Sequence, residues 1–187
     1  MKTASIIDKR WSPRAFDETE SLTREQVDSL FEAARWAPSS MNEQPWLYYY
    51  TTRKDSVSFS SYMDCLMPGN SSWAQRADLI ILSVARKKFR RNNKPNRHAL
   101  HDTGAANVLL ALRAAEMGLQ AHQMGGFDIA KTVELFNLDP EMYEPVTFIS
   151  VGTPVNPDIL PVELREREVA PRSRREVAEF VNNNLID

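Results

Sequence analysis

The sequence predicts an α+β fold, in which helices and strands interleave without the regular βαβ repeat of a parallel sheet. Three observations support this prediction: segments with helical spacing of apolar residues, short apolar or aromatic runs of strand length between them, and the absence of an internal repeat. The length of 187 residues suits a single domain, residues 1–187, with a substantial buried core.

The first predicted helix covers residues 23–36. Its apolar side chains recur with helical spacing, and Thr23 forms a capping box with Gln26 three residues later. Pro38 cannot continue a helix and therefore ends this one. A strand is expected next at residues 46–52, which are mostly aromatic or β-branched.

A longer helix is predicted at the centre of the chain. Residues 102–117 are apolar around most of the helix circumference, so this helix is expected to be buried, and Gly118 suits the position after its last turn. The other predicted elements are a helix at 56–65, a turn at 67–70, a largely apolar strand at 77–85, a strand at 120–123, a helix at 127–136, a strand at 147–151 and a last helix that begins with a capping box between Ser173 and Glu176.

Residues 152–171 break the pattern. They contain four prolines and a cluster of charges, and an unpatterned stretch of about 20 residues is uncommon inside a compact domain. The residues alone leave two interpretations equally open, an arm that lies on another subunit and a long surface loop.

The composition excludes several classes of protein. The formal charge of −2 argues against nucleic-acid binding over the whole surface. No apolar run approaches the ~18 residues that would span a bilayer, and the N-terminus lacks the apolar segment of a signal peptide. The single cysteine, Cys65, excludes an internal disulfide framework. We therefore expect a cytoplasmic protein with no membrane or nucleic-acid partner.

Few motifs indicate a metal or a nucleotide. The sequence contains neither a dinucleotide fingerprint nor a P-loop. His98, His101 and Asp102 lack a further strong ligand, so no metal site is predicted. Residues 86–97 hold seven basic side chains and no acid; such a run is most often a solvated loop, but it is also able to collect a phosphate-bearing ligand such as a nicotinamide dinucleotide or a nucleic acid.

Three polar clusters are candidates for binding a cofactor. Arg10, Ser12 and Arg14 place two guanidinium groups and a hydroxyl near the N-terminus, and guanidinium binds phosphate bidentately. Residues 38–46 carry two amide side chains that match the mixed edge of a heterocycle, although an ordinary turn has the same composition. Residues 123–127 include two glycines, which let the main chain approach a flat ligand closely.

Together these clusters resemble the nitroreductase family of FMN-dependent oxidoreductases. The resemblance covers nearly the whole chain: the Arg-x-Ser-x-Arg-x-Phe start at 10–16, the Ala-Pro-Ser-Ser-x-Asn-x-Gln-Pro-Trp segment at 37–46, the helix from Gly104 to Gly118, the Met-Gly-Gly-Phe stretch at 124–127 and the Pro-Arg-Ser-Arg stretch at 171–174. The Pro-Ser-Ser segment combined with the Arg-x-Ser start is the specific part.

The resemblance implies a nitroreductase-like fold with a mixed central sheet flanked by helices. Two chains would intertwine as a homodimer, with FMN at the interface and residues 152–171 as an arm on the partner subunit. The implied cofactor-binding residues are Arg10, Trp11, Ser12, Arg14, Pro38, Ser39, Ser40, Asn42, Asn70, Met124, Gly125, Gly126, Arg172 and Arg174.

The family pattern also implies a role for each group of residues. The phosphate and ribityl end of FMN would be held by Arg10, Ser12, Arg172 and Arg174, whereas Arg14 would face the pyrimidine edge and tune the flavin. Residues 38–42 would reach the same flavin from the partner chain. Asn70 would contact the ring, and residues 124–126 would pass beside its N5 atom.

The implied activity is that of an NAD(P)H-dependent flavin oxidoreductase. Hydride would pass from NADH or NADPH through flavin N5 to a small organic acceptor, such as a nitroaromatic or a quinone, in a ping-pong cycle. No side chain need act as a catalytic nucleophile. Trp11 and Gly125 depart from the family pattern, which commonly has a basic or polar residue and an acidic residue at these positions. These departures favour the alternative of a flavin-binding carrier or redox-responsive regulator with little turnover.

Overall fold

The computed structural model describes residues 5–183. At its centre four strands form a sheet in the order β1-β2-β4-β3. The strands are β1 (Trp46–Thr52), β2 (Leu79–Arg86), β3 (Gln120–Met124) and β4 (Tyr143–Gly152). All four predicted strands are confirmed, and β4 begins at Tyr143 rather than at Thr147.

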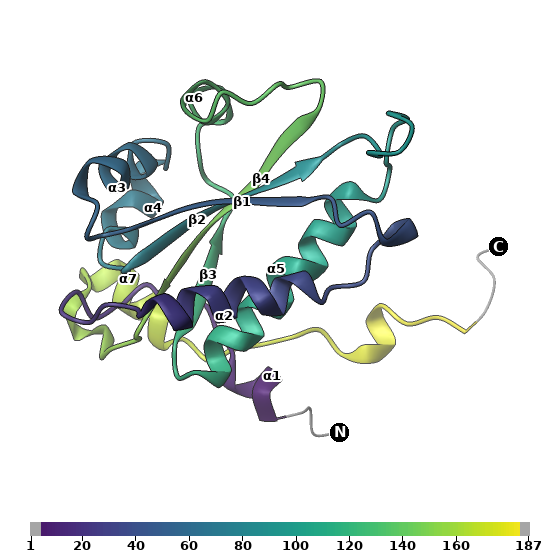
Figure 1. The fold of residues 1–187 in the computed structure, drawn as a ribbon. Coiled ribbons are helices and arrows are strands. Elements are labelled where there is room, and N and C mark those ends of the chain that lie inside the picture. The colour runs from purple at the N-terminus through teal and green to yellow at the C-terminus, as the bar shows by residue number, and fades with distance from the viewer. Residues whose placement is uncertain (1–4, 184–187) are drawn as a thin grey trace.

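Helices cover both faces of the sheet (Figure 1). One face carries α2 (Arg24–Arg35) and α5 (Ala99–Glu116), and the other carries α3 (Ser56–Met63), α4 (Pro68–Ala74) and α6 (Ile129–Leu135). Leu79 and Ile81 of β2 pack with the first group, whereas Ile80 and Leu82 pack with the second. Because successive strand residues point to opposite faces, the continuous apolar run of β2 supplies both cores.

The prediction of a mixed sheet is wrong for the described strands. β1 pairs with β2, β2 with β4 and β3 with β4, in each case antiparallel. β2 and β3 run in the same direction and are connected through α5. However, β4 lies between them and runs the opposite way, so no parallel pair forms.

The two longest predicted helices are confirmed. α2 begins after Thr23, whose capping box with Gln26 is formed. α5 starts at Ala99, earlier than the predicted Asp102, and Gly118 follows it with a φ of +81°. That left-handed conformation favours glycine. No helix within residues 5–183 is long and apolar enough to cross a membrane.

Two predicted elements are corrected. The expected turn at 67–70 is the start of α4, where Pro68 occupies the first turn and needs no N–H partner. The helix expected from Ser173 is wrong, because its described residues form only one 3₁₀ turn, Val177–Glu179, which Glu176 caps. Residues 171–183 are exposed, and a short helix with no surface beneath its apolar side chains is marginal.

Residues 152–171 contain a helix that the sequence pattern did not reveal. α7 (Val162–Val169) is too rich in charge to show an apolar stripe. The segment packs on the N-terminal region of its own chain: the Val155 N–H donates to the Ala15 carbonyl at 3.1 Å, and Leu160 is buried. Its contact with a second subunit stays a prediction.

The N-terminal segment runs along the edge strand β3. After α1 (Ser5–Lys9), the Trp11 N–H donates to Oε1 of Gln120 at 3.1 Å, and Nε2 of Gln120 donates to the Lys9 carbonyl at 3.1 Å. Nδ1 of His122 lies 2.8 Å from the Pro13 carbonyl. These side-chain bonds hold the first polar cluster beside β3.

Candidate functional site

The two ends of the described chain meet at a small cavity of about 200 Å³, which we call the arginine pocket. It is lined by Arg10, Trp11, Ser12, Arg14, Arg167, Glu168, Ala170, Arg172 and Arg174. The structure therefore brings together six of the predicted cofactor-binding residues, although more than 150 positions separate the two groups in sequence. Five guanidinium groups face one carboxylate, so the lining is strongly cationic.

Arg172 fixes the two groups of residues to each other. Its guanidinium donates to the main-chain carbonyls of Arg10 at 2.8 Å and of Asp8 at 2.7 Å. Burial lowers the pKa of Arg10, and the nearby charges of Arg174 and Arg172 lower it further. Clustered cations repel one another, so this arrangement favours an anion that neutralises them.

Arg14 also lies in the pocket, but its charge is paired. Its guanidinium is 3.1 Å from Oε2 of Glu168, whose side chain is only 1% exposed. Oε1 of Glu168 accepts the main-chain N–H of Arg14 at 2.7 Å and that of Ala15 at 3.4 Å. Glu168 thus joins α7 to the N-terminal segment and balances the charge of Arg14, for which the family resemblance implies a place at the pyrimidine edge.

The glycines lie where β3 ends. Nδ2 of Asn70 donates to the Gly126 carbonyl at 2.9 Å, and a Cβ on Gly126 would lie only 2.8 Å from that nitrogen. A side chain at position 126 would therefore displace the Asn70 amide from this bond. A Cβ on Gly125 would meet no atom within 4 Å, so the space beside its exposed main chain is open to a ligand. Met124 is buried in the core.

His122 connects the glycines to the arginine pocket along β3. Its ring lies 4.5 Å from the ring of Trp73, centroid to centroid, and its Nδ1 contacts Pro13. Burial lowers the pKa of His122, the Pro13 carbonyl opposes that shift, and the charge of Arg14 adds to it. A neutral imidazole with a proton on Nδ1 satisfies the Pro13 carbonyl.

Residues 38–44, the 38–44 loop, lie away from this pocket. Met41, Asn42 and Gln44 have φ values of 56°, 55° and 50°, a left-handed conformation that costs energy for residues other than glycine. Asp102 and Ser39 hold the loop: Oδ2 of Asp102 accepts the Ser40 N–H at 2.9 Å, and Oγ of Ser39 accepts the Gln44 N–H at 3.0 Å.

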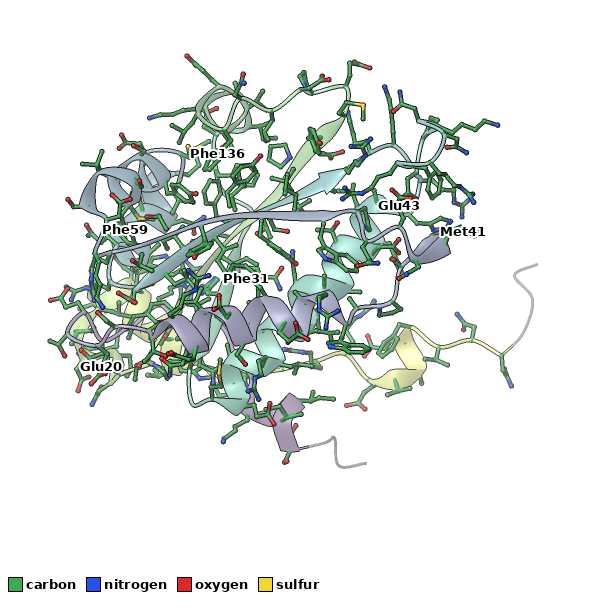
Figure 2. The ribbon with its side chains drawn as sticks, in the orientation of Figure 1. Glu20, Phe31, Met41, Glu43, Phe59 and Phe136 are labelled. Atoms are coloured by element: carbon green, nitrogen blue, oxygen red, sulfur yellow. The ribbon has the colours of Figure 1, made fainter. Side chains whose placement is uncertain are left out.

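Figures 1 and 2 show how far apart the two regions lie within one chain. Met41 and Glu43 stand together beyond the start of β1, at the opposite end of the molecule from Glu20 and α7. The loop borders another cavity, of about 570 Å³, with the basic residues that follow β2. A single chain therefore does not bring Pro38, Ser39, Ser40 or Asn42 to the arginine pocket.

Sequence reasoning missed three residues of these sites. Arg167 and Glu168 enter the arginine pocket only because α7 folds back onto the N-terminal segment, and that packing left no periodic signal. The sequence places Asp102 at the start of the central helix and assigns it no site role, whereas in the structure its carboxylate anchors the 38–44 loop. The sole hint was its place beside the start of a predicted helix.

The chain is similar to proteins of one family. A model of the nitroreductase family matches residues 7–153. The Bacillus subtilis protein YdgI, provisionally named an NAD(P)H nitroreductase, is 25% identical, and the match covers 79% of this chain and 86% of YdgI.

Solved structures share the fold over the full chain. A crystal structure described as an oxidoreductase containing FMN has a TM-score of 0.92 and 32% identity, covering 100% of this chain and 94% of that one. A provisionally named nitroreductase from Exiguobacterium sibiricum, solved in complex with FMN, has a TM-score of 0.77 and 19% identity, covering 98% and 99% of the two chains. At that lower identity the second likeness shows the fold alone.

Proposed function

The chain belongs to the nitroreductase family of oxidoreductases, and from this membership we propose that it uses FMN to pass hydride from NADH or NADPH to a small organic acceptor in a ping-pong cycle. When bound, the flavin supplies the two-electron chemistry at its N5 atom. A nitroaromatic or a quinone is the class of acceptor proposed. Each turnover consumes one reduced nucleotide and one proton.

The arginine pocket is the observation that carries this proposal. An FMN phosphate bears a charge of roughly −1.5 to −2 at neutral pH. The pocket offers the guanidinium groups of Arg10, Arg172 and Arg174, and Arg167 adds a further one. The residues present therefore fit the phosphate end of FMN. Burial is the main cause of the lowered pKa of Arg10, and binding a phosphate would relieve the repulsion from Arg174 and Arg172 that adds to it.

The open main chain at Gly125 supports the position of the ring. Its N–H and the space beside it are available to a flat ligand, whereas Asn70 keeps Gly126 in place. Arg14 acts on the ring end through a charge that Glu168 partly balances. Trp11 lines the pocket as a flat wall in place of a phosphate donor.

A homodimer is part of the proposal. Leu100, Gly104 and Val108 lie four residues apart along α5, and Leu100 and Val108 are 47% and 49% exposed. Val177, Phe180 and Val181 are likewise exposed beyond the arginine pocket. A second chain that packed on the α5 stripe and under the C-terminal segment would bury these side chains. The second chain would also contribute its own 38–44 loop to the flavin that the first chain holds.

We include residues 152–171 in this interface, within one domain that spans residues 1–187. The inner face of the segment packs on its own chain through Val155 and Leu160. Its outer face carries the exposed side chains of Val162 and Val169, at 58% and 63%. These are the positions that would meet the partner subunit.

The test is a visible absorbance spectrum of the purified protein. We expect bound FMN and loss of its oxidised band when NADH or NADPH is added without oxygen. Turnover with a quinone should follow. A protein that takes up no FMN contradicts the proposal, and bound FMN without nucleotide oxidation favours the carrier instead.

A further inference from the structure

The basic residues after β2 form an ordered hairpin loop, residues 87–96, which we call the basic hairpin. Lys88 pairs with Pro95, and the Phe89 N–H donates to the Lys94 carbonyl at 2.9 Å. The Asn96 N–H donates to the Lys87 carbonyl at 2.7 Å and closes the base of the loop. A sequence pattern typical of a solvated loop therefore folds into a defined shape.

The tip of the basic hairpin is attached to the 38–44 loop. Oε1 of Glu43, whose side chain is only 8% exposed, accepts the main-chain N–H of Arg90 at 2.7 Å. The Arg90 guanidinium lies 3.8 Å from the same carboxylate and stays 62% exposed. The main chain of Arg90 thus makes the attachment, and its guanidinium remains accessible.

Between these two loops lies the cavity of about 570 Å³, lined by Met41, Asn42, Glu43, Gln44, Trp46, Arg90 and Arg91. It combines an indole ring, a thioether, two side-chain amides, two guanidinium groups and the Glu43 carboxylate, which balances part of the Arg90 charge. An aromatic wall suits a nucleobase, the Gln44 amide suits its polar edge, and neighbouring guanidinium groups suit a phosphate.

Most of the positive charge on the hairpin is uncompensated. Among residues 5–183, acidic partners are found for Lys88 and Arg90 at 4.0 and 3.8 Å, whereas Lys87, Arg91 and Lys94 have no ion pair. Arg91 stacks over Phe89 at 5.5 Å from its ring centroid. Arg91 thus occupies one face of Phe89, and this single ring is the sole aromatic residue of the hairpin. Stacking on successive bases of a nucleic acid needs several such rings, which favours a single small phosphate ligand here.

We propose that Arg90 and Arg91 bind the 2′-phosphate of NADPH in this cavity and make NADPH the preferred hydride donor over NADH. The inference rests on the proposed function, in which the 38–44 loop reaches the flavin. A donor whose nicotinamide reaches that flavin would extend its adenosine end past the same loop. NADPH and NADH differ only in this phosphate, so discrimination must come from groups that contact it.

The binding test uses 2′,5′-ADP and 5′-AMP as probes on the FMN-loaded protein, followed by calorimetry. We expect 2′,5′-ADP to bind at least tenfold more tightly than 5′-AMP. Arg90→Gln and Arg91→Gln should each reduce that preference, because both leave the main-chain bond to Glu43 intact. Arg97→Gln, in the same basic run but outside the cavity, is the matched control and should keep the wild-type preference.

The kinetic test compares kcat/KM for NADPH with kcat/KM for NADH. The ratio should exceed ten in the wild type and fall at least tenfold in Arg91→Gln, with partial rescue by Arg91→Lys. Equal affinity for the two probes, or equal kcat/KM for the two donors, overturns the inference and leaves the oxidoreductase intact.

Loss of the proposed function would give a different result, because neither nucleotide would be oxidised while probe binding would still report on the cavity. A nucleic-acid ligand would give another result. An oligonucleotide would then bind more tightly than 2′,5′-ADP, its affinity would depend on salt, and Arg91→Gln would abolish the binding. This outcome would overturn the inference.

Discussion

Arg14 and Glu168 form a buried ion pair in the arginine pocket, and their two opposite charges together determine the electrostatic potential there. The carboxylate accepts two main-chain N–H groups besides the guanidinium, so it cannot turn away without leaving them unpaired. Two-electron reduction of FMN adds negative charge to the ring. The Arg14 cation therefore stabilises the reduced form, and the Glu168 carboxylate destabilises it.

Opposite shifts in flavin potential are therefore expected from the two neutral variants. Arg14→Gln should lower the midpoint potential and Glu168→Gln should raise it, each on the order of 30 mV, which corresponds to ~1.4 kcal/mol for a two-electron couple. An anaerobic redox titration measures both. Shifts of the same sign would show that structural loosening, rather than charge, determines the effect.

His122 makes the stability of the protein depend on pH. Burial holds its pKa below the usual value of 6.5, so between the folded and unfolded pKa values the unfolded chain binds a proton that the folded chain does not. The free energy of unfolding should therefore decrease as the pH falls below about 6.5. Above that pH, His122 is neutral in both states and its contribution to the free energy of unfolding is fully present.

Guanidinium denaturation at pH 7.5 and pH 5.5 tests this expectation. His122→Gln, which retains a donor for the Pro13 carbonyl, should lose less stability over that interval than the wild type. Identical losses in the two proteins would show that other groups cause the pH dependence.

At the level of elements, α5 has a buried face and an exposed apolar stripe. Gly104 lies in that stripe, and a Cβ there would meet no atom within 4 Å. In an isolated chain, Gly104→Ala would stabilise the helix by ~1 kcal/mol through its higher propensity. If a second chain packs closely at this position, Gly104→Ala should instead destabilise the protein.

Val108→Glu should prevent dimer formation, because an unpaired carboxylate buried in an apolar interface costs ~3 kcal/mol or more. Light scattering coupled to size exclusion measures the mass. Val57→Glu is the matched control, since Val57 is an exposed valine of α3 on the other side of the sheet. A dimeric Val108→Glu protein would place the interface elsewhere.

Elements with strong local signals were predictable from the sequence. The capping box at Thr23 and the aromatic run of β1 gave both elements nearly their observed bounds. α7 and the segment after Ser173 were not predictable, because their conformations depend on what they pack against. α7 forms on the N-terminal segment, whereas the residues after Ser173 have nothing beneath them in one chain, and the predicted capping box does not form.

The same distinction applies to the candidate site. Arg10, Ser12, Arg172 and Arg174 were predicted through their resemblance to a family, and the fold does bring them together. Glu168 could not be predicted, since an ion pair between residues 154 positions apart exists only in the folded chain.

For the whole molecule, we expect the C-terminal segment to contribute to FMN binding. Residues 171–183 are exposed throughout, yet Arg172 and Arg174 line the arginine pocket. A chain that ends at Ala170 tests this contribution. Its affinity for FMN should fall roughly tenfold or more, because charge-assisted hydrogen bonds contribute about 1.5–3 kcal/mol each.

Fluorescence quenching of FMN measures that affinity. Arg172→Gln combined with Arg174→Gln keeps the full length and should reproduce the loss. If only the shortened chain loses affinity, the segment acts through its contacts with a second chain and not through these two cations.

The order of the strands also determines when the protein is able to fold during its synthesis. Of the strands within residues 5–183, β4 is the last to leave the ribosome, yet it fills the place between β2 and β3. Until residue 152 has emerged, both neighbours expose unpaired edges, and β2 is a continuous apolar run. We expect nascent chains halted before β4 to aggregate unless a chaperone shields them, since long-range pairing of this kind forms slowly.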